Sequence, residues 1–188
     1  MLLQGLTIKF SRDAKRHRLQ RVVRSPMRGN EMQPGALLSP CRTFRYDLWR
    51  TWIGGDGYAM FVGLNPSTAD ETEDDPTIRR CVAFAKAWGY AGLCMTNLFA
   101  FRATQPADML RAPDPVGPLN DEVLRDRAAG AGVVVAAWGV HGTFAGRDRA
   151  VRAGLPQLHY LRLTKDGHPG HPLYLPKTLE PVAWGSNA

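Results

Sequence analysis

The sequence lacks three features that would each have narrowed its function. No apolar run in its 188 residues approaches the roughly 18 residues of a membrane-spanning helix. The start is apolar only as far as Leu3 and the basic residues follow it, so no signal peptide is expected. The three cysteines, Cys41, Cys81 and Cys94, are too few and too widely spaced for a disulfide framework or a four-thiolate metal site. We therefore expect a cytoplasmic protein with buried free thiols, no cofactor and no membrane partner.

The sequence also lacks a charge excess outside its first 30 residues, although the net charge of the whole chain is +7. Residues 1–30 hold eight Lys and Arg side chains but a single acid, Asp13, and the remaining 158 residues hold 16 side chains of each sign. A basic arm can contact phosphate groups without sequence specificity, or it can be an extension without a partner. We expect a disordered basic extension over residues 1–40 and a single domain over residues 41–188.

Hydrophobic alternation gives the first structural signal of the domain. Residues 44–48 alternate apolar and polar side chains, which predicts a half-buried strand with Arg45 on its polar side. A glycine-rich turn over 54–57 and an apolar run over 58–64 follow. The two segments predict an antiparallel hairpin, and a helix over 44–53 remains the alternative.

Proline and capping residues mark the first helix. Asp75 suits the N-cap, Pro76 suits the first helical position, and Gly89 suits the end of a helix over 77–88. The remaining pattern predicts strands over 92–99, 133–138 and 158–163, and helices over 104–109 (capped by Thr104), 121–129 (capped by Asn120) and 144–153. Alternating strands and helices predict a three-layer α/β/α sandwich with a mostly parallel central sheet and helices on both faces.

Polar side chains follow two of the predicted strands. Asn65 comes shortly after the strand that ends at Val62, and His171 follows the last strand. Ligands of parallel α/β sheets bind at the carboxyl ends of the strands, so Asn65 and His171 are expected to face one pocket. Pro66 holds Asn65 in an extended conformation, which would direct its amide at a water or a ligand carbonyl. The alternative is an Asx turn within the loop.

The loop over 67–75 is rich in acids and hydroxyls, including Ser67, Asp70 and Asp75. A solvated surface or a helix cap explains most of these side chains. Asp70 or Asp75 could also assist Asn65 in positioning a water. A divalent-metal site for phosphoester hydrolysis is a third interpretation, although no histidine or ligand spacing makes it specific.

Asn97 lies in the apolar run 93–99, near the end of the predicted strand. A buried amide there needs partners, and either a turn or a bound planar base can supply them. Phe99 and Phe101 could stack on a flat ligand or belong to the core. Arg102 could bind phosphate or pair with an acid.

His171 lies in a rigid Gly/Pro-rich stretch, residues 167–172 (GHPGHP). An imidazole held there could stabilise developing negative charge. The alternative is a surface turn, which we favour for the neighbouring His168.

Four segments resemble motifs of the uracil-DNA glycosylase superfamily. They are residues 63–67 (GLNPS), 92–97 (GLCMTN), 133–139 (VVVAAWG) and 171–173 (HPL). Longer strings resemble more closely the DUF1643 family of unknown function: residues 64–70 (LNPSTAD), 75–80 (DPTIRR), 97–104 (NLFAFRAT) and 171–176 (HPLYLP). The resemblance implies a glycosylase-like α/β fold over about residues 40–180.

The expected function is a DNA glycosylase-like hydrolysis of the N-glycosidic bond of a flipped, damaged or modified nucleobase. Asn65 would orient water, His171 would stabilise the departing base, and Asn97 would read the edge of the base. The other expected contacts are Gly63, Pro66, Ser67, Phe99, Phe101 and Arg102 to the substrate, and Arg79 and Arg80 to phosphates. The alternative is an inactive module that binds a nucleotide or a modified base, as in a phage–host conflict. Either way the partner is DNA or a nucleotide, with the oligomeric state left open.

Overall fold

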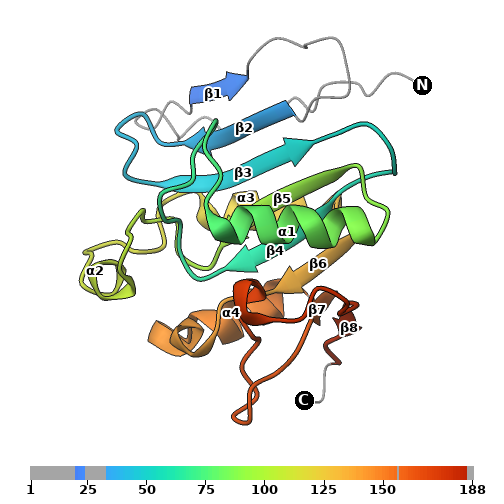
Figure 1. Cartoon of the computed structure of the whole chain (residues 1–188). Helices are drawn as coiled ribbons and strands as arrows, with labels where there is room; N and C mark the ends of the chain where they lie inside the picture. The colour runs from blue at the N-terminus through green and yellow to red at the C-terminus, as the bar shows by residue number, and fades with distance from the viewer. Residues whose placement is uncertain (1–19, 24–32, 156, 186–188) are drawn as a thin grey trace.

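A single mixed β-sheet forms the centre of the protein (Figure 1). The computed structural model describes residues 20–23, 33–155 and 157–185. Within them, eight strands are arranged in the order β1-β2-β3-β5-β4-β6-β7-β8. The strands are β1 (Gln20–Val23), β2 (Gln33–Leu38), β3 (Arg45–Thr51), β4 (Ala59–Gly63), β5 (Gly92–Asn97), β6 (Val133–Ala136), β7 (Leu158–Tyr160) and β8 (Val182–Ala183).

The α/β class is confirmed, but the predicted mostly parallel sheet is wrong. Strands β5, β4, β6 and β7 are parallel to one another. The remaining pairs, β1–β2, β2–β3, β3–β5 and β7–β8, are antiparallel. Antiparallel strands therefore extend a parallel centre at both of its edges.

The predicted hairpin between the first two strands of the domain is also wrong. Strand β5 lies between β3 and β4, with Leu48 paired to Met95 on one side and Phe61 paired to Met95 on the other. The glycine-rich turn does reverse the chain, with positive φ at Gly54 and Gly55. A turn determines that the chain reverses its direction, but it does not determine which strand the returning segment pairs with. Here β5 is inserted between β3 and β4.

The sheet begins earlier in the chain than the predicted boundary at residue 41. Strand β2 pairs with β3, and its residues Ala36, Leu37 and Leu38 are buried. Strand β1 adds to the same edge. The rest of the expected N-terminal extension, residues 1–19 and 24–32, lies outside the described residues.

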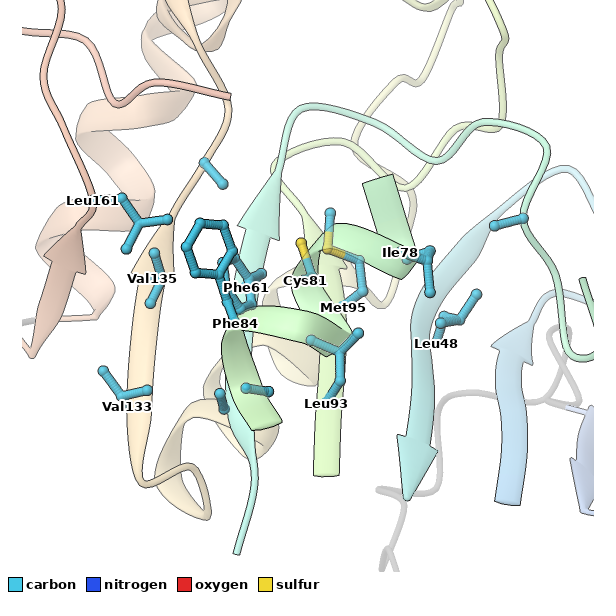
Figure 2. Close-up of a cluster of buried hydrophobic side chains, with 14 of the residues drawn as sticks. Leu48, Phe61, Ile78, Cys81, Phe84, Leu93, Met95, Val133, Val135 and Leu161 are labelled. Carbon is cyan, nitrogen blue, oxygen red and sulfur yellow. The ribbon is translucent and has the colours of Figure 1, made fainter. Parts of the chain in front are cut away.

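Helices lie on both faces of the sheet. On one face, α1 (Pro76–Ala87) packs Ile78, Cys81 and Phe84 against strand residues such as Phe61 (Figure 2). On the other face, the buried cluster takes residues from α2 (Pro106–Leu110), α3 (Asn120–Ala129) and α4 (Arg147–Gly154). Strand β4 serves both clusters, because successive side chains along a strand point to opposite faces.

Helix α1 begins as predicted. Asp75 Oδ1 accepts a hydrogen bond of 2.8 Å from the backbone N–H of Ile78, and Pro76 occupies the first turn. The other helix starts differ from the prediction. Helix α2 follows Gln105 rather than Thr104, and Asn120 lies inside α3, buried, instead of capping it.

Two shorter segments also differ from the prediction. The sequence predicts the last helix over 144–153. The structure has a 3-10 turn, η1 (Val140–Gly146), at the start of that range, and α4 follows it. The last parallel strand, β7, covers only half of its predicted length. The segment around His171 forms a second 3-10 turn, η2 (Pro172–Tyr174).

The cysteines are free, but Cys41 is exposed and not buried as expected. Cys81 and Cys94 are buried on opposite faces of the sheet. In the part of the chain that the structure describes, no helix is both long and apolar enough to cross a membrane.

Candidate functional site

A cavity of about 630 Å³ opens at the carboxyl ends of the central strands, beside the start of α1. Asn65, Asn97 and His171 all line it. These three side chains come from distant parts of the sequence. The loop after β4, the end of β5 and the segment before η2 bring them together. Further walls come from Gly63, Leu64, Ser67, Thr68, Asp75–Ile78, Met95, Ala103, Thr104, Pro106, Trp138–His141, Leu173 and Tyr174.

Asn97 presents an unpaired amide to this cavity. The residue is 1% exposed, and neither its Oδ1 nor its Nδ2 has a hydrogen-bond partner among the described residues. Leaving a buried polar group unsatisfied costs about 1–3 kcal/mol, so such groups are rare in folded proteins. An adjacent donor and acceptor in one plane are suited to a ligand that carries the complementary pair.

Gly63 makes room for this amide. It is paired with Asn97 in the register of β4 and β5. A Cβ at Gly63 would lie 2.9 Å from Asn97 Oδ1 and 2.7 Å from the terminal methyl of Met95. Any side chain at position 63 therefore collides with the amide or displaces it, which explains the glycine at the end of a buried strand.

Two buried side chains hold the backbone at Asn97 in place. Asn120 Nδ2 donates to the carbonyls of Asn97 and Leu98, at 3.1 and 2.8 Å. Arg147 Nε donates to the Leu98 carbonyl at 2.9 Å, and its Nη2 pairs with Asp121. Side chains of α3 and α4 thus fix the backbone at Asn97 and Leu98. The Asn97 side chain itself has no hydrogen-bond partner among the described residues.

Asn65 is oriented by its neighbours. Its Nδ2 donates to the carbonyls of Pro66 and Ala103, at 3.0 and 2.7 Å. The amide NH₂ is committed to the protein, so Oδ1 is the atom with which Asn65 can accept a hydrogen bond from a ligand or a water. Asn65 thus combines a local hydrogen bond to Pro66 with a position in the cavity lining.

The tautomer of His171 follows from its hydrogen bond. Nδ1 accepts the backbone N–H of Leu173 at 3.4 Å, so the proton of the neutral ring resides on Nε2. Burial lowers the pKa of His171 below its ordinary value, and the nearby Asp75 carboxylate acts in the opposite direction. A neutral imidazole with an Nε2–H donor is the expected form at pH 7.

Arg45 is the main lining residue that sequence reasoning missed. Alternation placed it on the solvated side of a half-buried strand, but β3 lies inside the sheet between β2 and β5, and residues on both of its faces are buried. Arg45 is 2% exposed, and its Nη1 donates to the Ala69 carbonyl at 2.6 Å. Burial lowers its pKa to about 10, against the opposing effect of Asp75. No local sequence signal distinguishes this arginine from an exposed one.

Trp138 also lines the cavity, although the sequence placed it only in a motif at the end of a strand and not among the site residues. It is 3% exposed, and its ring packs against Trp184 with 5.8 Å between the centroids. The predicted stacking residues lie elsewhere. Phe99 is fully buried against Phe144, and Phe101 packs edge-on against Phe44. Trp138 is therefore the buried aromatic ring that the cavity offers to a flat ligand.

The candidate phosphate contacts are engaged within the protein, outside the cavity lining. Arg79 Nη1 donates to the Asp74 carbonyl, and Arg80 Nη2 donates to the Leu173 carbonyl at 3.3 Å. Arg102 Nη1 donates to the carbonyl of Arg42. Pro66 is buried next to the cavity without being one of its lining residues.

The acids of the 70–75 loop serve the fold. Asp70 accepts hydrogen bonds from the backbone of Thr72 and Glu73, so it closes its own turn and does not line the cavity. Glu71 and Asp74 pair with arginines, and Asp75 caps α1. Within the described residues, no group of three or more His, Cys, Asp or Glu side chains is placed to hold a metal ion.

The fold and the site define an α/β protein with one polar cavity at the carboxyl edge of its central strands. The family model described as a protein of unknown function (DUF1643) matches residues 45–173, and the chain belongs to this family. Neither the curated proteins nor the solved structures include a match. The likeness to uracil-DNA glycosylases stays a prediction.

Proposed function

We propose that the cavity binds a nucleobase and that the protein hydrolyses the N-glycosidic bond of the nucleotide that carries it. The unpartnered amide of Asn97 is the observation on which the proposal rests. A donor and an acceptor side by side match the hydrogen-bonding edge of a nucleobase, and Trp138 supplies an apolar ring in the same cavity. A volume of about 630 Å³ lies within the roughly 300–1,000 Å³ typical of small-molecule sites.

The proposed chemistry follows from the atoms that the cavity leaves available. The bond between the base nitrogen and the sugar carbon breaks, and its electron pair leaves with the base. His171 donates a hydrogen bond from its Nε2–H to the departing base and stabilises the developing negative charge, and the released base anion then takes a proton from solvent. Asn65 Oδ1 accepts a hydrogen bond from the water that adds to the sugar carbon. Asp75 lines the same cavity and takes the proton that this water loses.

A second candidate is a module that binds the base without cleaving it. Two observations favour it. Asp75 already uses Oδ1 to cap α1, and position 65 carries an amide instead of a carboxylate. An amide orients a water but does not accept its proton, so the chemistry would depend on Asp75 alone.

Single-turnover base release distinguishes the two candidates. The substrates are DNA strands and mononucleotides with uracil, hypoxanthine, oxidised or hypermodified bases, and the products are free base and abasic sugar. A hydrolase releases at least one of these bases, and Asn65→Ala and His171→Ala each slow the release by at least about tenfold, or about 1.4 kcal/mol in the barrier. His168→Ala is the matched control, because His168 lies in the same loop but outside the cavity lining.

One result decides against the hydrolase, and another decides against the residue roles assigned within it. If a base or nucleotide raises the melting temperature but no base is released from any substrate, the binding module replaces it. If release occurs but both variants keep the wild-type rate, the assigned roles of Asn65 and His171 are wrong.

A further inference from the structure

Three buried arginines of this protein differ in how their charge is satisfied. Arg50 is fully buried, and it bonds to the Asp74 carboxylate and to the carbonyls of Trp49 and Asp70. Arg147 pairs with Asp121. Arg45 has no carboxylate within hydrogen-bond distance in the part of the chain that the structure describes. Among the described residues, the guanidinium of Arg45 makes one hydrogen bond, to the Ala69 carbonyl.

The unsatisfied atoms of Arg45 belong to the cavity. Arg45 lines it, and Nε is buried without a partner among the described residues. A guanidinium offers five N–H donors in a planar fork, and within the described ranges that of Arg45 donates through Nη1 alone. Burying a charge is costly unless another group compensates it. The free donors therefore point to an anionic group that is supplied by the ligand.

The surroundings of Arg45 also suit an anion. Pro76 and Thr77, in the first turn of the 12-residue helix α1, line the same cavity. The N-terminus of a helix carries a partial positive charge that favours negative groups. Asp75 is the one acid of the cavity lining, and it uses Oδ1 on the N-terminus of α1 rather than on Arg45.

Arg45 lies on the strand next to the one that carries Asn97. Strands β3 and β5 are paired, and the backbone N–H of Arg45 donates to the carbonyl of Ala100, just beyond the end of β5. One cavity thus offers an amide that is suited to a base and a guanidinium that is suited to an anion.

We infer that Arg45 is an anion-binding residue of this cavity and that the ligand is a nucleotide whose phosphate it contacts. The nucleotide part of this inference rests on the proposed function. Two planar N–H donors of a guanidinium match two oxygens of a phosphate. A free mononucleotide and a nucleotide within a single strand present the same phosphate, so the two sources must be separated by experiment.

Calorimetric binding to paired probes tests the inference. The probes are the 2′-deoxynucleosides of the four common bases and of the bases in the release assay, the 5′-monophosphate of each, a short single strand of the same base, and inorganic phosphate. We expect at least one monophosphate to bind about tenfold or more tightly than its nucleoside. Arg45→Gln should abolish that difference, so that the monophosphate binds no more tightly than its nucleoside. Arg125→Gln, an exposed arginine on α3, is the matched charge control.

Arg45→Lys keeps the test decisive if the Gln variant fails to fold. It retains the charge but loses the planar fork, so it should bind the monophosphate more weakly than wild type and more tightly than the nucleoside. The single-strand arm identifies the source of the phosphate: tighter binding of the strand indicates nucleic acid, and tighter binding of the monophosphate indicates a free nucleotide.

The failures of the two proposals are distinguishable. Equal binding of nucleoside and monophosphate by wild type overturns the role of Arg45 and leaves the base site intact. Binding of inorganic phosphate that Arg45→Gln abolishes, without binding of any nucleoside, keeps the anion site and overturns the proposed function. If neither phosphate nor any monophosphate binds, the role of Arg45 is wrong.

Discussion

Replacement of Asn97 by alanine should change stability and ligand binding in opposite directions. Both polar atoms of this amide are buried without partners in the described part of the chain. An unsatisfied buried polar group costs about 1–3 kcal/mol, and its removal recovers part of that cost. The loss of side-chain packing offsets another part. We therefore expect Asn97→Ala to raise the free energy of unfolding by about 1 kcal/mol and to lower base or nucleotide affinity by about tenfold or more.

The matched control is Asn120→Ala. Asn120 is equally buried, and its Oδ1 also lacks a partner among the described residues, but its Nδ2 donates to the carbonyls of Asn97 and Leu98. Its loss removes two hydrogen bonds, so this variant should be destabilised by about 1–2 kcal/mol. Urea unfolding followed by tryptophan fluorescence measures both variants on one scale. If Asn97→Ala is destabilised as much as Asn120→Ala, the amide has a partner in the free protein and the reasoning fails.

Three further variants test other parts of the site. Gly63→Ala should push the Asn97 amide aside, because its Cβ would lie 2.9 Å from Oδ1. Ligand titration should show weaker binding, and the free energy of unfolding should fall by about 1–3 kcal/mol. Ligand binding at the wild-type affinity would contradict this prediction. His171→Gln should keep more activity than His171→Ala, because glutamine retains a neutral donor; equal rates of base release would count against the donor role. Asp74→Ala should lower the free energy of unfolding, measured in urea, by about 3–5 kcal/mol, because it removes the carboxylate that pairs with the buried Arg50. A decrease below about 1 kcal/mol would contradict this prediction.

The direction of the His171 pKa shift predicts a pH dependence. Burial lowers this pKa below 6.5, so the folded state favours the neutral ring. The stability that the neutral ring contributes is complete above the unfolded pKa and declines as the pH falls through 6.5 towards the folded pKa. Protonation at Nδ1 would also oppose the N–H of Leu173, so base release should decline over the same range. NMR titration of the His171 ring gives the folded pKa, and a value above 6.5 would contradict the account.

Local sequence signals predicted the parts of the fold that depend on neighbouring residues. The Asp75–Pro76 pair located the start of α1, because capping and the fixed φ of proline act within one turn. The rule that ligands bind at the carboxyl ends of parallel strands grouped Asn65 with His171, and both line one cavity.

Features that depend on distant pairing could not be predicted in this way. The place of β5 between β3 and β4 is a property of the whole sheet, and no turn residue encodes it. The burial of Arg45 depends on segments far away in the sequence, such as the loop whose Ala69 carbonyl accepts its hydrogen bond, so alternation alone placed it in solvent. The core role of Phe99 depends in the same way on distant residues, because it belongs to the buried cluster to which α2, α3 and α4 contribute.

The amide NMR signals of the Asn97 side chain give the most direct test of the claim that this cavity binds a nucleobase. Addition of nucleosides and nucleotides to the ¹⁵N-labelled protein should shift the Nδ2 resonances saturably for at least one base, since that NH₂ gains its first partner. The same titration should leave the Asn120 amide nearly unmoved. If every base leaves the Asn97 signals unchanged at concentrations that saturate binding elsewhere on the protein, the claim is wrong.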